Sequence, residues 1–420
     1  MSFASLLTRL RYPEKAKTLS LYRRMKTMSE AEISDFQFQR LHKLFSHFYE
    51  TMPFYRKTCE DCGISPEQIT GLEDLLRLPV MNKEILRTNE EEIKARAGKA
   101  VRRSTSGSTG VNFHFYLDRS SKSAHNAFAD LYHERLGIRR GLTVGIWGGN
   151  LKKPEDRSFL QTIKLWLLKT ELLPGYGMDE ARACDYLRYI QRKKPTFVYG
   201  YPSYLAFLAR SGKAAQLPPP KGFVLVASGE QMTELDRVVI EEYFQTKVYN
   251  RYGSCEFSTI AHELPDEKDF YVCPAEFLLE TNENDELLVT DLWNFATPFI
   301  RYNIGDRASL VCENGVCRIK ELYGRCNDVL FTPSGKMIPS QFWTILSRMC
   351  EEVEAFQTVQ LSATNLVMRV KSKTEFDPTP ILENFNKNFG DEMQLLVTRE
   401  EAFETTKMGK HKFVIRKETV

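Results

Sequence analysis

The sequence lacks the features that mark membrane-spanning, secreted or nucleic-acid-binding proteins. Its most apolar helical stretch, residues 159–173, contains three charged residues and is shorter than the about 20 residues that a membrane span needs. Residues 1–15 contain neither the apolar region nor the cleavage site of a secretory signal. The net charge of +3 provides no strong attraction to nucleic acid or anionic lipid. We therefore expect a soluble, cytoplasmic protein with no stable membrane insertion and no nucleic-acid partner.

The nine cysteines do not form the dense framework of a small secreted protein, so we expect reduced thiols. Cys59 and Cys62 are interpreted as packing residues because no second pair follows them. Cys255, His262 and Cys273 are candidate ligands of a structural zinc ion. They lack an evident fourth ligand, and their spacing matches no common zinc motif, so three unconnected buried residues are the alternative.

The chain is too long for one ordinary hydrophobic core, so more than one domain is expected. The spacing of apolar residues predicts helices over residues 14–60, then a short helix, a Leu-Pro break and a helix capped by Asn82. Between residues 142 and 253, short apolar runs alternate with helical patterns, which indicates an α/β sheet. From residue 270 onward, Asn, Asp and Gly turns separate strands and predict hairpins.

The pattern changes again near Gly324. We therefore expect two domains, an N-terminal domain over residues 1–324 and a small α+β domain over residues 325–420.

Residues 104–110 contain only Ser, Thr and Gly, and a bulky apolar segment follows them. Glycine lets the backbone approach a ligand closely, and exposed N–H and hydroxyl groups can surround phosphate oxygens. The segment is not a P-loop, because the lysine of that motif is absent. Taken alone, it is either a phosphate-binding loop or a flexible surface loop.

Five further segments of the chain favour the phosphate-binding interpretation of residues 104–110. All six segments occur over residues 70–420 in the order that one protein family shows. Together they resemble the adenylate-forming superfamily, most closely the phenylacetate–CoA ligase branch with its CapK-like members from capsular polysaccharide gene clusters. The six segments are TSGSTG (105–110), ASGEQM (227–232), YNRYGSCE (249–256), YNIGD (302–306), GRCND (324–328) and KMGKHKF (407–413).

The resemblance implies an α/β fold with a large N-terminal AMP- and acid-binding domain of mixed sheets, and a small mobile C-terminal lid domain. It implies an enzyme that joins a carboxylic acid, aryl or acyl, to ATP with Mg²⁺, forms an acyl-adenylate and transfers the acyl group to CoA or a carrier thiol. One alternative is an amide- or ester-forming ligase of polysaccharide, cofactor or natural-product synthesis, with an amine or alcohol acceptor. Another is a catalytically silent nucleotide-binding scaffold. The acid, the acceptor and the oligomeric state stay open.

The resemblance also assigns roles to the nucleotide-binding motifs. In it, Glu256 holds Mg²⁺ and acts in catalysis, Tyr252 stacks on adenine and Asp306 accepts the ribose hydroxyls. Arg325 approaches ribose and phosphate. The other nucleotide-binding residues are Ser106, Gly107, Ser108, Thr109, Gly110, Ser228, Gly229, Glu230, Gly253 and Ser254. A core aromatic residue is the alternative for Tyr252, and a surface carboxylate is the alternative for Glu256.

Further residues are assigned to catalysis, domain movement and acid binding. Lys410 and Thr109 are expected catalytic residues, and Asn327 is the expected hinge. A solvated lysine in a basic tail is the alternative for Lys410. The expected walls of the acid pocket are His125, Phe128, Trp147, Tyr199 and Tyr201. Ordinary core packing is the alternative for these aromatic residues.

The sequence departs from the family pattern at two places. Val111 and Asn112 follow the phosphate loop where relatives commonly have Thr or Lys and then Pro, so we expect the stiffness of the loop and its hold on phosphate to differ from theirs. Cys255 stands where many relatives have Thr or Ser.

Overall fold

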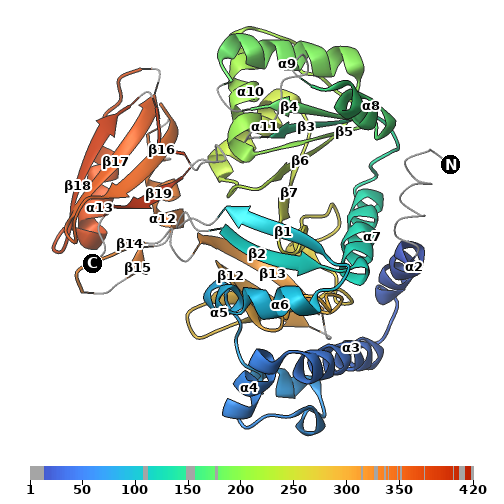
Figure 1. The fold of residues 1–420 in the computed structure, drawn as a ribbon. Coiled ribbons are helices and arrows are strands. Elements are labelled where there is room, and N and C mark those ends of the chain that lie inside the picture. The colour runs from blue at the N-terminus through green and yellow to red at the C-terminus, as the bar shows by residue number, and fades with distance from the viewer. Residues whose placement is uncertain are drawn as a thin grey trace. The chain divides into compact units, whose positions relative to one another are not determined.

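The structure, a computed structural model, contains two compact units (Figure 1). Unit 1 comprises Met1–Gly141, Ile163–Lys169 and Tyr249–Leu322, and unit 2 comprises Leu142–Thr162, Thr170–Val248 and Tyr323–Val420. The residues that it describes are 14–106, 112–147, 157–175, 178–313, 316–325, 330–334, 337–338, 340–347, 349–350, 352–372, 374–400, 402–405 and 412–417.

Unit 1 begins with helices, which confirms the prediction for residues 14–60. Ser29 and Glu32 form a capping box at the start of the longest helix, because each side chain accepts a hydrogen bond from the other residue's backbone N–H. The expected Asn82 cap is also confirmed, since its side chain accepts from the N–H of Ile85 at 2.9 Å. These elements are α2 (Lys15–Met25), α3 (Glu30–Thr51), α4 (Pro53–Asp61), the 3-10 helices η1 (Pro66–Gln68) and η2 (Leu72–Arg77), α5 (Lys83–Thr88) and α6 (Glu90–Arg96).

The rest of unit 1 is mostly antiparallel sheet. Strands β1 (Val101–Ser106) and β2 (Asn112–Leu117) pair with each other, and helix α7 (Arg119–Arg135) follows them. The other strands lie in the order β10-β11-β12-β13-β9-β8-β7. They are β7 (Val248–Tyr252), β8 (Ala261–His262), β9 (Phe270–Val272), β10 (Phe277–Thr281), β11 (Glu286–Asp291), β12 (Tyr302–Glu313) and β13 (Val316–Arg325).

The hairpin expected after residue 270 is present between β10 and β11. The side chain of Asn282 accepts hydrogen bonds from the backbone N–H groups of Asn284 and Glu286 and so closes the turn.

Unit 2 contains a parallel sheet with strand order β6-β5-β3-β4. The apolar runs that predicted strands form it, and their side chains make a buried core that includes Val144, Val198 and Leu225. Because parallel strands point in one direction, the residues at their carboxyl ends lie at one edge of the sheet. The elements are β3 (Thr143–Trp147), β4 (Thr170–Pro174), α9 (Glu180–Lys193), β5 (Phe197–Gly200), α10 (Pro202–Ala214), β6 (Val224–Ser228) and α11 (Glu234–Phe244). Helix α8 (Phe159–Leu167) has its first four residues in unit 2 and the others in unit 1.

The C-terminal part of the chain mixes helix and strand, as expected from its sequence. Strands β18, β17, β16 and β19 form a sheet in that order, over a separate core that includes Trp343 and Phe385. The α/β fold class is confirmed, whereas the boundary at residues 324 and 325 stays a prediction. The elements are β14 (Leu330–Phe331), β15 (Met337–Ile338), α12 (Ser340–Ser347), β16 (Val353–Gln360), β17 (Asn365–Ser372), α13 (Thr379–Phe389), β18 (Gln394–Arg399) and β19 (Val414–Arg416).

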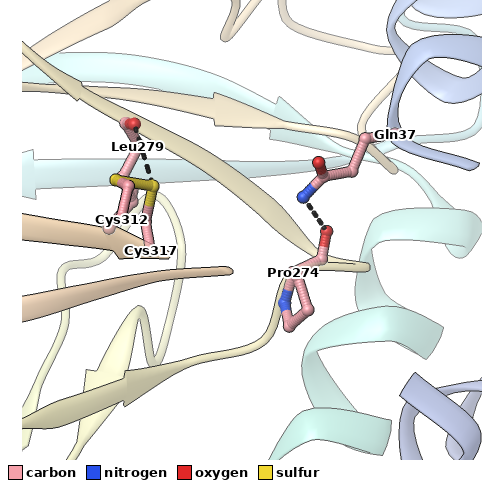
Figure 2. The surroundings of a disulfide bond; sticks show 5 residues. All are labelled: Gln37, Pro274, Leu279, Cys312 and Cys317. Carbon is pink, nitrogen blue, oxygen red and sulfur yellow. Dashed lines mark hydrogen bonds between the residues drawn. A yellow bond between two sulfur atoms is a disulfide. The ribbon is translucent and has the colours of Figure 1, made fainter. Parts of the chain in front are cut away.

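A disulfide joins Cys312 of β12 to Cys317 of β13, with Cα atoms 4.0 Å apart (Figure 2). The expectation that the cysteines are reduced thiols is therefore wrong for this pair. Its cause is local, because consecutive strands place the two side chains side by side, which cysteine number and spacing alone did not reveal. In the same region of unit 1, the Gln37 side chain donates to the carbonyl of Pro274 at 2.9 Å and anchors α3 to the segment before β10 (Figure 2).

Among the described residues, no helix has both the length and the apolarity needed to cross a bilayer. The apolar stretch that begins at residue 159 forms α8 and β4 instead. Helix α8 buries none of its residues, and Phe159 and Trp166 are 78% and 75% exposed.

Thr297 provides a test of how β2 is attached to the segment before β12. Its buried hydroxyl accepts from the N–H of Tyr116 at 2.9 Å and donates to the carbonyl of Tyr116 at 3.0 Å. Thr297→Val keeps the shape but leaves the Tyr116 N–H unpaired, so the free energy of unfolding should fall by about 1–3 kcal/mol in urea denaturation. Thr297→Ser, which keeps the hydroxyl, is the control and should lose less. Equal losses in the two variants would show that the hydrogen bonds are unimportant.

Candidate functional site

In unit 1 the carboxylate of Glu256 is nearly fully buried, with 2% of the residue exposed. The Tyr302 hydroxyl at the start of β12 donates to its Oε1 at 3.4 Å. The Lys83 ammonium, in the first turn of α5, lies 3.7 Å from the same oxygen. A carboxylate so withdrawn from water needs positive or hydrogen-bonding partners. Both partners, Lys83 and Tyr302, belong to elements that are distant in sequence from Glu256.

The ring of Tyr302 is held in an aromatic cluster. Its centroid lies 4.9 Å from that of Phe299, 5.9 Å from Phe257 and 6.4 Å from Phe113. Phe257 directly follows Glu256 in the chain, so one cluster positions both the tyrosine hydroxyl and the carboxylate that it contacts.

Tyr252 and Asp306, two expected nucleotide-binding residues, are brought together from β7 and β12. The Tyr252 hydroxyl donates to Oδ2 of Asp306 at 2.6 Å. Gly305, before Asp306, has φ +83°, a conformation that glycine adopts without strain. Gly253, after Tyr252, leaves no room for a side chain, because a Cβ would lie 1.9 Å from the carbonyl oxygen of Ser258. The glycines in both motifs therefore have a backbone reason for their position.

Ser254 lies in the same turn. Its hydroxyl accepts from the backbone N–H of Phe257 at 3.4 Å, which closes the turn that carries Glu256.

In unit 2 the Ser228–Glu230 turn lies beside two of the expected aromatic residues, Trp147 and Tyr201, and Tyr199 packs on Trp147. The rings of Trp147 and Tyr201 are 4.5 Å apart between centroids, and those of Trp147 and Tyr199 are 5.6 Å apart. Gly229 has φ +87°, and a Cβ there would meet the Tyr201 ring at 2.8 Å. The carboxyl ends of β3, β5 and β6 thus carry an aromatic group packed against a glycine turn.

Glu230 also has a local structural role. Its carboxylate accepts hydrogen bonds from the hydroxyl of Ser203 at 2.6 Å and from the Ser203 backbone N–H at 3.3 Å. Ser203 lies in the first turn of α10, where backbone N–H groups lack helical partners and favour negative charge.

The expected pocket residues of α7, His125 and Phe128, lie in the interior of unit 1. Nε2 of His125 is 3.3 Å from Oδ2 of Asp291 and 3.9 Å from Oε1 of Glu276. Burial and the Asp291 carboxylate raise the pKa of Glu276 well above its usual range. Phe128 packs on the rings of His262 and Tyr271. A substrate role for His125 and Phe128 stays a prediction.

Several expected site residues lie outside the described residues, namely Gly107, Ser108, Thr109, Gly110, Asn327 and Lys410. Ser106 and Arg325 are placed as strand residues at the ends of β1 and β13, and their side chains are not described. Their roles stay predictions.

The zinc site that the sequence left open is not supported. Among the described residues, no group of three or more His, Cys, Asp or Glu side chains is arranged to hold a metal ion. Cys273 and His262 are buried and Cys255 is exposed. Burial lowers the pKa of His262 to about 3. In the Cys59–Cys62 pair, burial raises the pKa of the Cys59 thiol to about 12, which makes it a poor nucleophile.

Sequence reasoning missed two neighbours of Glu256, Lys83 and Tyr302. Both had a signal, since Lys83 follows the recognised cap Asn82 and Tyr302 begins the YNIGD motif. Neither signal indicated that the two residues meet the same carboxylate.

Comparisons with known proteins give similarities at low identity over most of the chain, and the sequence matches no family model. The chain is 24% identical to Protein CapK of Staphylococcus aureus over 385 residues, covering 87% of this chain and 84% of that protein. It is 26% identical to a phenylacetate–coenzyme A ligase of Thermus thermophilus, covering 80% of each. A crystal structure of 2-hydroxyisobutyryl-CoA ligase in the postadenylation state with 2-HIB-AMP has a TM-score of 0.74 at 21% identity, covering 93% of this chain and 90% of that one.

The depressed pKa of His262 predicts a pH dependence of stability. The unfolded chain takes up a proton near pH 6.5, whereas the buried ring does so only near pH 3, so the unfolded state binds more protons between these values. This contribution to stability is complete above pH 6.5 and declines as the pH falls, by up to about 1.4 kcal/mol per pH unit. Replacing His262 by Phe should flatten the pH profile of the free energy of unfolding between pH 6.5 and about pH 4.

His42→Phe is the matched control, because His42 lies on the partly exposed side of α3. Unchanged slopes in His262→Phe, or equal flattening by both substitutions, would contradict the assignment to His262.

Proposed function

The chain belongs to the adenylate-forming superfamily, in the branch of phenylacetate–CoA ligases and CapK-like proteins, and on that premise we propose that it is an AMP-forming ligase. A carboxylate oxygen of the acid attacks the α-phosphorus of ATP, the bond to the β-phosphate oxygen breaks, and pyrophosphate leaves. A thiol sulfur then attacks the acyl carbon, loses its proton and releases AMP. The thiol of CoA is the proposed acceptor, supported by the relatives that are named coenzyme A ligases.

The observation that supports this function most is the meeting of Tyr252 and Asp306. Two motifs more than fifty residues apart in the sequence place a phenol and a carboxylate 2.6 Å apart. In our proposal the carboxylate of Asp306 accepts both ribose hydroxyls, because an ionised acceptor makes strong hydrogen bonds with two adjacent donors. The Tyr252 hydroxyl orients that carboxylate, and the Tyr252 ring lies against adenine.

Glu256 fits a magnesium ligand. Its carboxylate is an oxygen ligand of the kind that Mg²⁺ prefers, and Mg²⁺ is commonly held by one or two carboxylates together with phosphate oxygens. When bound, the ion neutralises phosphate charge. Tyr302 orients the carboxylate through its hydrogen bond, and Lys83 provides additional positive charge beside it.

The aromatic group of unit 2 supports an acid that has a flat or apolar portion. Trp147 and Tyr199 offer partly exposed ring surface, and the buried Tyr201 packs between Trp147 and the Ser228–Glu230 turn. Apolar walls with few polar groups are typical of small-molecule sites. We propose an aryl or acyl acid on this basis. The family resemblance supplies three further parts of the proposal. They are a phosphate loop at residues 106–110, a hinge at Asn327 and a mobile lid over residues 325–420.

The proposal is tested by measuring pyrophosphate release across a panel of aryl, fatty and amino acids with Mg-ATP, with and without CoA. Acid-dependent release is expected, together with CoA thioester formation for at least one acid. Adenylate formation that is consumed only by an amine or alcohol would identify the amide- or ester-forming alternative. The absence of acid-dependent release with every acid would identify the silent scaffold.

Asp306→Ala should weaken ATP and AMP binding with little effect on the fold. Removal of the carboxylate leaves each ribose hydroxyl without its partner, at a cost of about 1–3 kcal/mol per lost partner. Calorimetric titration measures the affinity, and thermal unfolding checks the fold. Tyr252→Phe, which keeps the ring but removes the hydroxyl, should cause a smaller loss. Wild-type affinity in Asp306→Ala would remove the ribose role.

Lys410→Ala should reduce adenylation by at least about a hundredfold while ATP binding stays nearly unchanged. The proposed reason is that the ammonium group stabilises the negative charge that accumulates as the acid attacks the α-phosphate, an interaction made mainly in the transition state. Pyrophosphate release under saturating ATP is the measurement, and transfer from a supplied acyl-adenylate should persist.

Lys407→Ala and Lys412→Ala are the controls within the same basic tail. A loss in either that equals the loss in Lys410→Ala, or normal pyrophosphate release in Lys410→Ala, would reject the catalytic assignment.

A further inference from the structure

Unit 1 contains a cavity of about 610 Å³ whose lining residues belong to none of the six nucleotide-binding motifs. Helices α2 and α3, the first turn of α7 and the segment after β11 surround it. Its volume lies within the range of small-molecule sites. Its lining combines positive charge with aromatic surface through Lys17, Arg40, Lys43, His47, Trp293 and Phe295.

Arg40 is the most constrained of these residues. Its Nε and Nη2 atoms donate to the carbonyl of Leu292 at 3.2 Å and 2.7 Å, and its guanidinium lies 4.0 Å from the centroid of the Trp293 ring. Trp293 is itself held by a 2.7 Å hydrogen bond from its indole N–H to the Ala275 carbonyl. The guanidinium plane is therefore fixed.

Arg40 forms no ion pair with a carboxylate among the described residues, and Nη1 makes no hydrogen bond to them. Burial withdraws part of the guanidinium from water and thereby lowers its pKa. An arginine that is fixed, partly desolvated and without a carboxylate at ion-pair distance is arranged to receive an oxyanion.

Two lysines and a helix terminus add to this positive field. Lys17 of α2 and Lys43 of α3 are exposed at the cavity and form no ion pair with the described residues. Ser120 belongs to the first turn of α7, a 17-residue helix whose N-terminus carries partial positive charge. The terminal N–H groups and the hydroxyl of Ser120 are further donors.

The carboxylates of Asp291, Asp118 and Glu14 attract the Arg40 guanidinium electrostatically and offset part of this field, but none forms an ion pair with it. Glu14 is the one carboxylate in the described lining. Asp118 accepts from the N–H groups of Ser121 and Phe295, and Asp291 accepts from the N–H of Trp293 behind the aromatic ring. Three permanent cations therefore face one lining carboxylate.

We propose that this cavity is a second ligand site of the protein, specific for a phosphate monoester. Arg40, Lys17 and Lys43 donate to the phosphate oxygens, with Ser120 at the helix terminus, while Trp293 and Phe295 cover the organic portion. The phosphate belongs either to a soluble metabolite or to a lipid headgroup, which share this chemistry. The proposal is independent of the adenylating function.

The test uses the full-length protein with saturating Mg-ATP present, so that a nucleotide site is occupied. Glycerol 3-phosphate is titrated by calorimetry, and vesicles of phosphatidic acid, whose headgroup is a phosphate monoester, or of phosphatidylcholine are tested by co-sedimentation. We expect saturable binding of one phosphate ligand per chain. The double variant Lys17→Glu and Lys43→Glu should weaken that binding by at least about tenfold. Its acid-dependent pyrophosphate release should equal that of the wild type.

Lys57→Glu is the matched control, because Lys57 is an exposed lysine of α4 in the same unit and gives the same type of charge reversal. Binding of glycerol 3-phosphate identifies a soluble ligand, and binding to phosphatidic acid vesicles alone identifies a headgroup. Either result supports the site if it depends on Lys17 and Lys43. Absence of saturable binding to both probes at millimolar phosphate, or equal weakening by Lys57→Glu, would overturn the proposal.

Discussion

The start of strand β12 is the constraint on which the candidate site of unit 1 depends. Tyr302 is fully buried among three phenylalanine rings, and this packing directs its hydroxyl toward Glu256. Four residues later the same strand carries Asp306 to the Tyr252 hydroxyl. The backbone of Met81 bonds on both sides of Tyr302, to the carbonyl of Arg301 and the N–H of Asn303, so α5 begins beside this strand. Aromatic packing thereby sets the positions of a carboxylate, a phenol and an ammonium group.

Unit 1 holds its buried charges in two different ways. Glu256 has a lysine and a tyrosine hydroxyl beside it. Glu276 and Asp291 instead lie beside His125, and burial together with the Asp291 carboxylate raises the pKa of Glu276. Desolvation penalises an ionised group, and a positive or hydrogen-bonding partner offsets that penalty. This difference supports Glu256, rather than the deeper acidic pair, as the proposed magnesium ligand.

Local sequence patterns predicted much of the fold because their causes are local. The Asn82 cap depends on atoms three residues apart, and the strands β3, β5 and β6 depend on short apolar runs that end in turn residues. The glycine of each motif was also recognisable from the sequence, but the structural reason why glycine is needed there was not. At Gly253 that reason is the carbonyl of Ser258, and at Gly229 it is the ring of Tyr201. The first follows from a tight turn, whereas the second needs two parallel strands to end at the same edge.

The sequence by itself determined the α/β class, the order of the six motifs and the residue types available for nucleotide chemistry. Only the tertiary structure decided that Lys83 and Tyr302 meet at Glu256, that Cys312 and Cys317 form a disulfide, and that His125 faces two buried carboxylates. The physical reason is the range of the interactions. Caps, turns and amphipathic periods arise within a few residues, whereas ion pairs and ring contacts depend on which distant segments the hydrophobic core brings within a few ångströms.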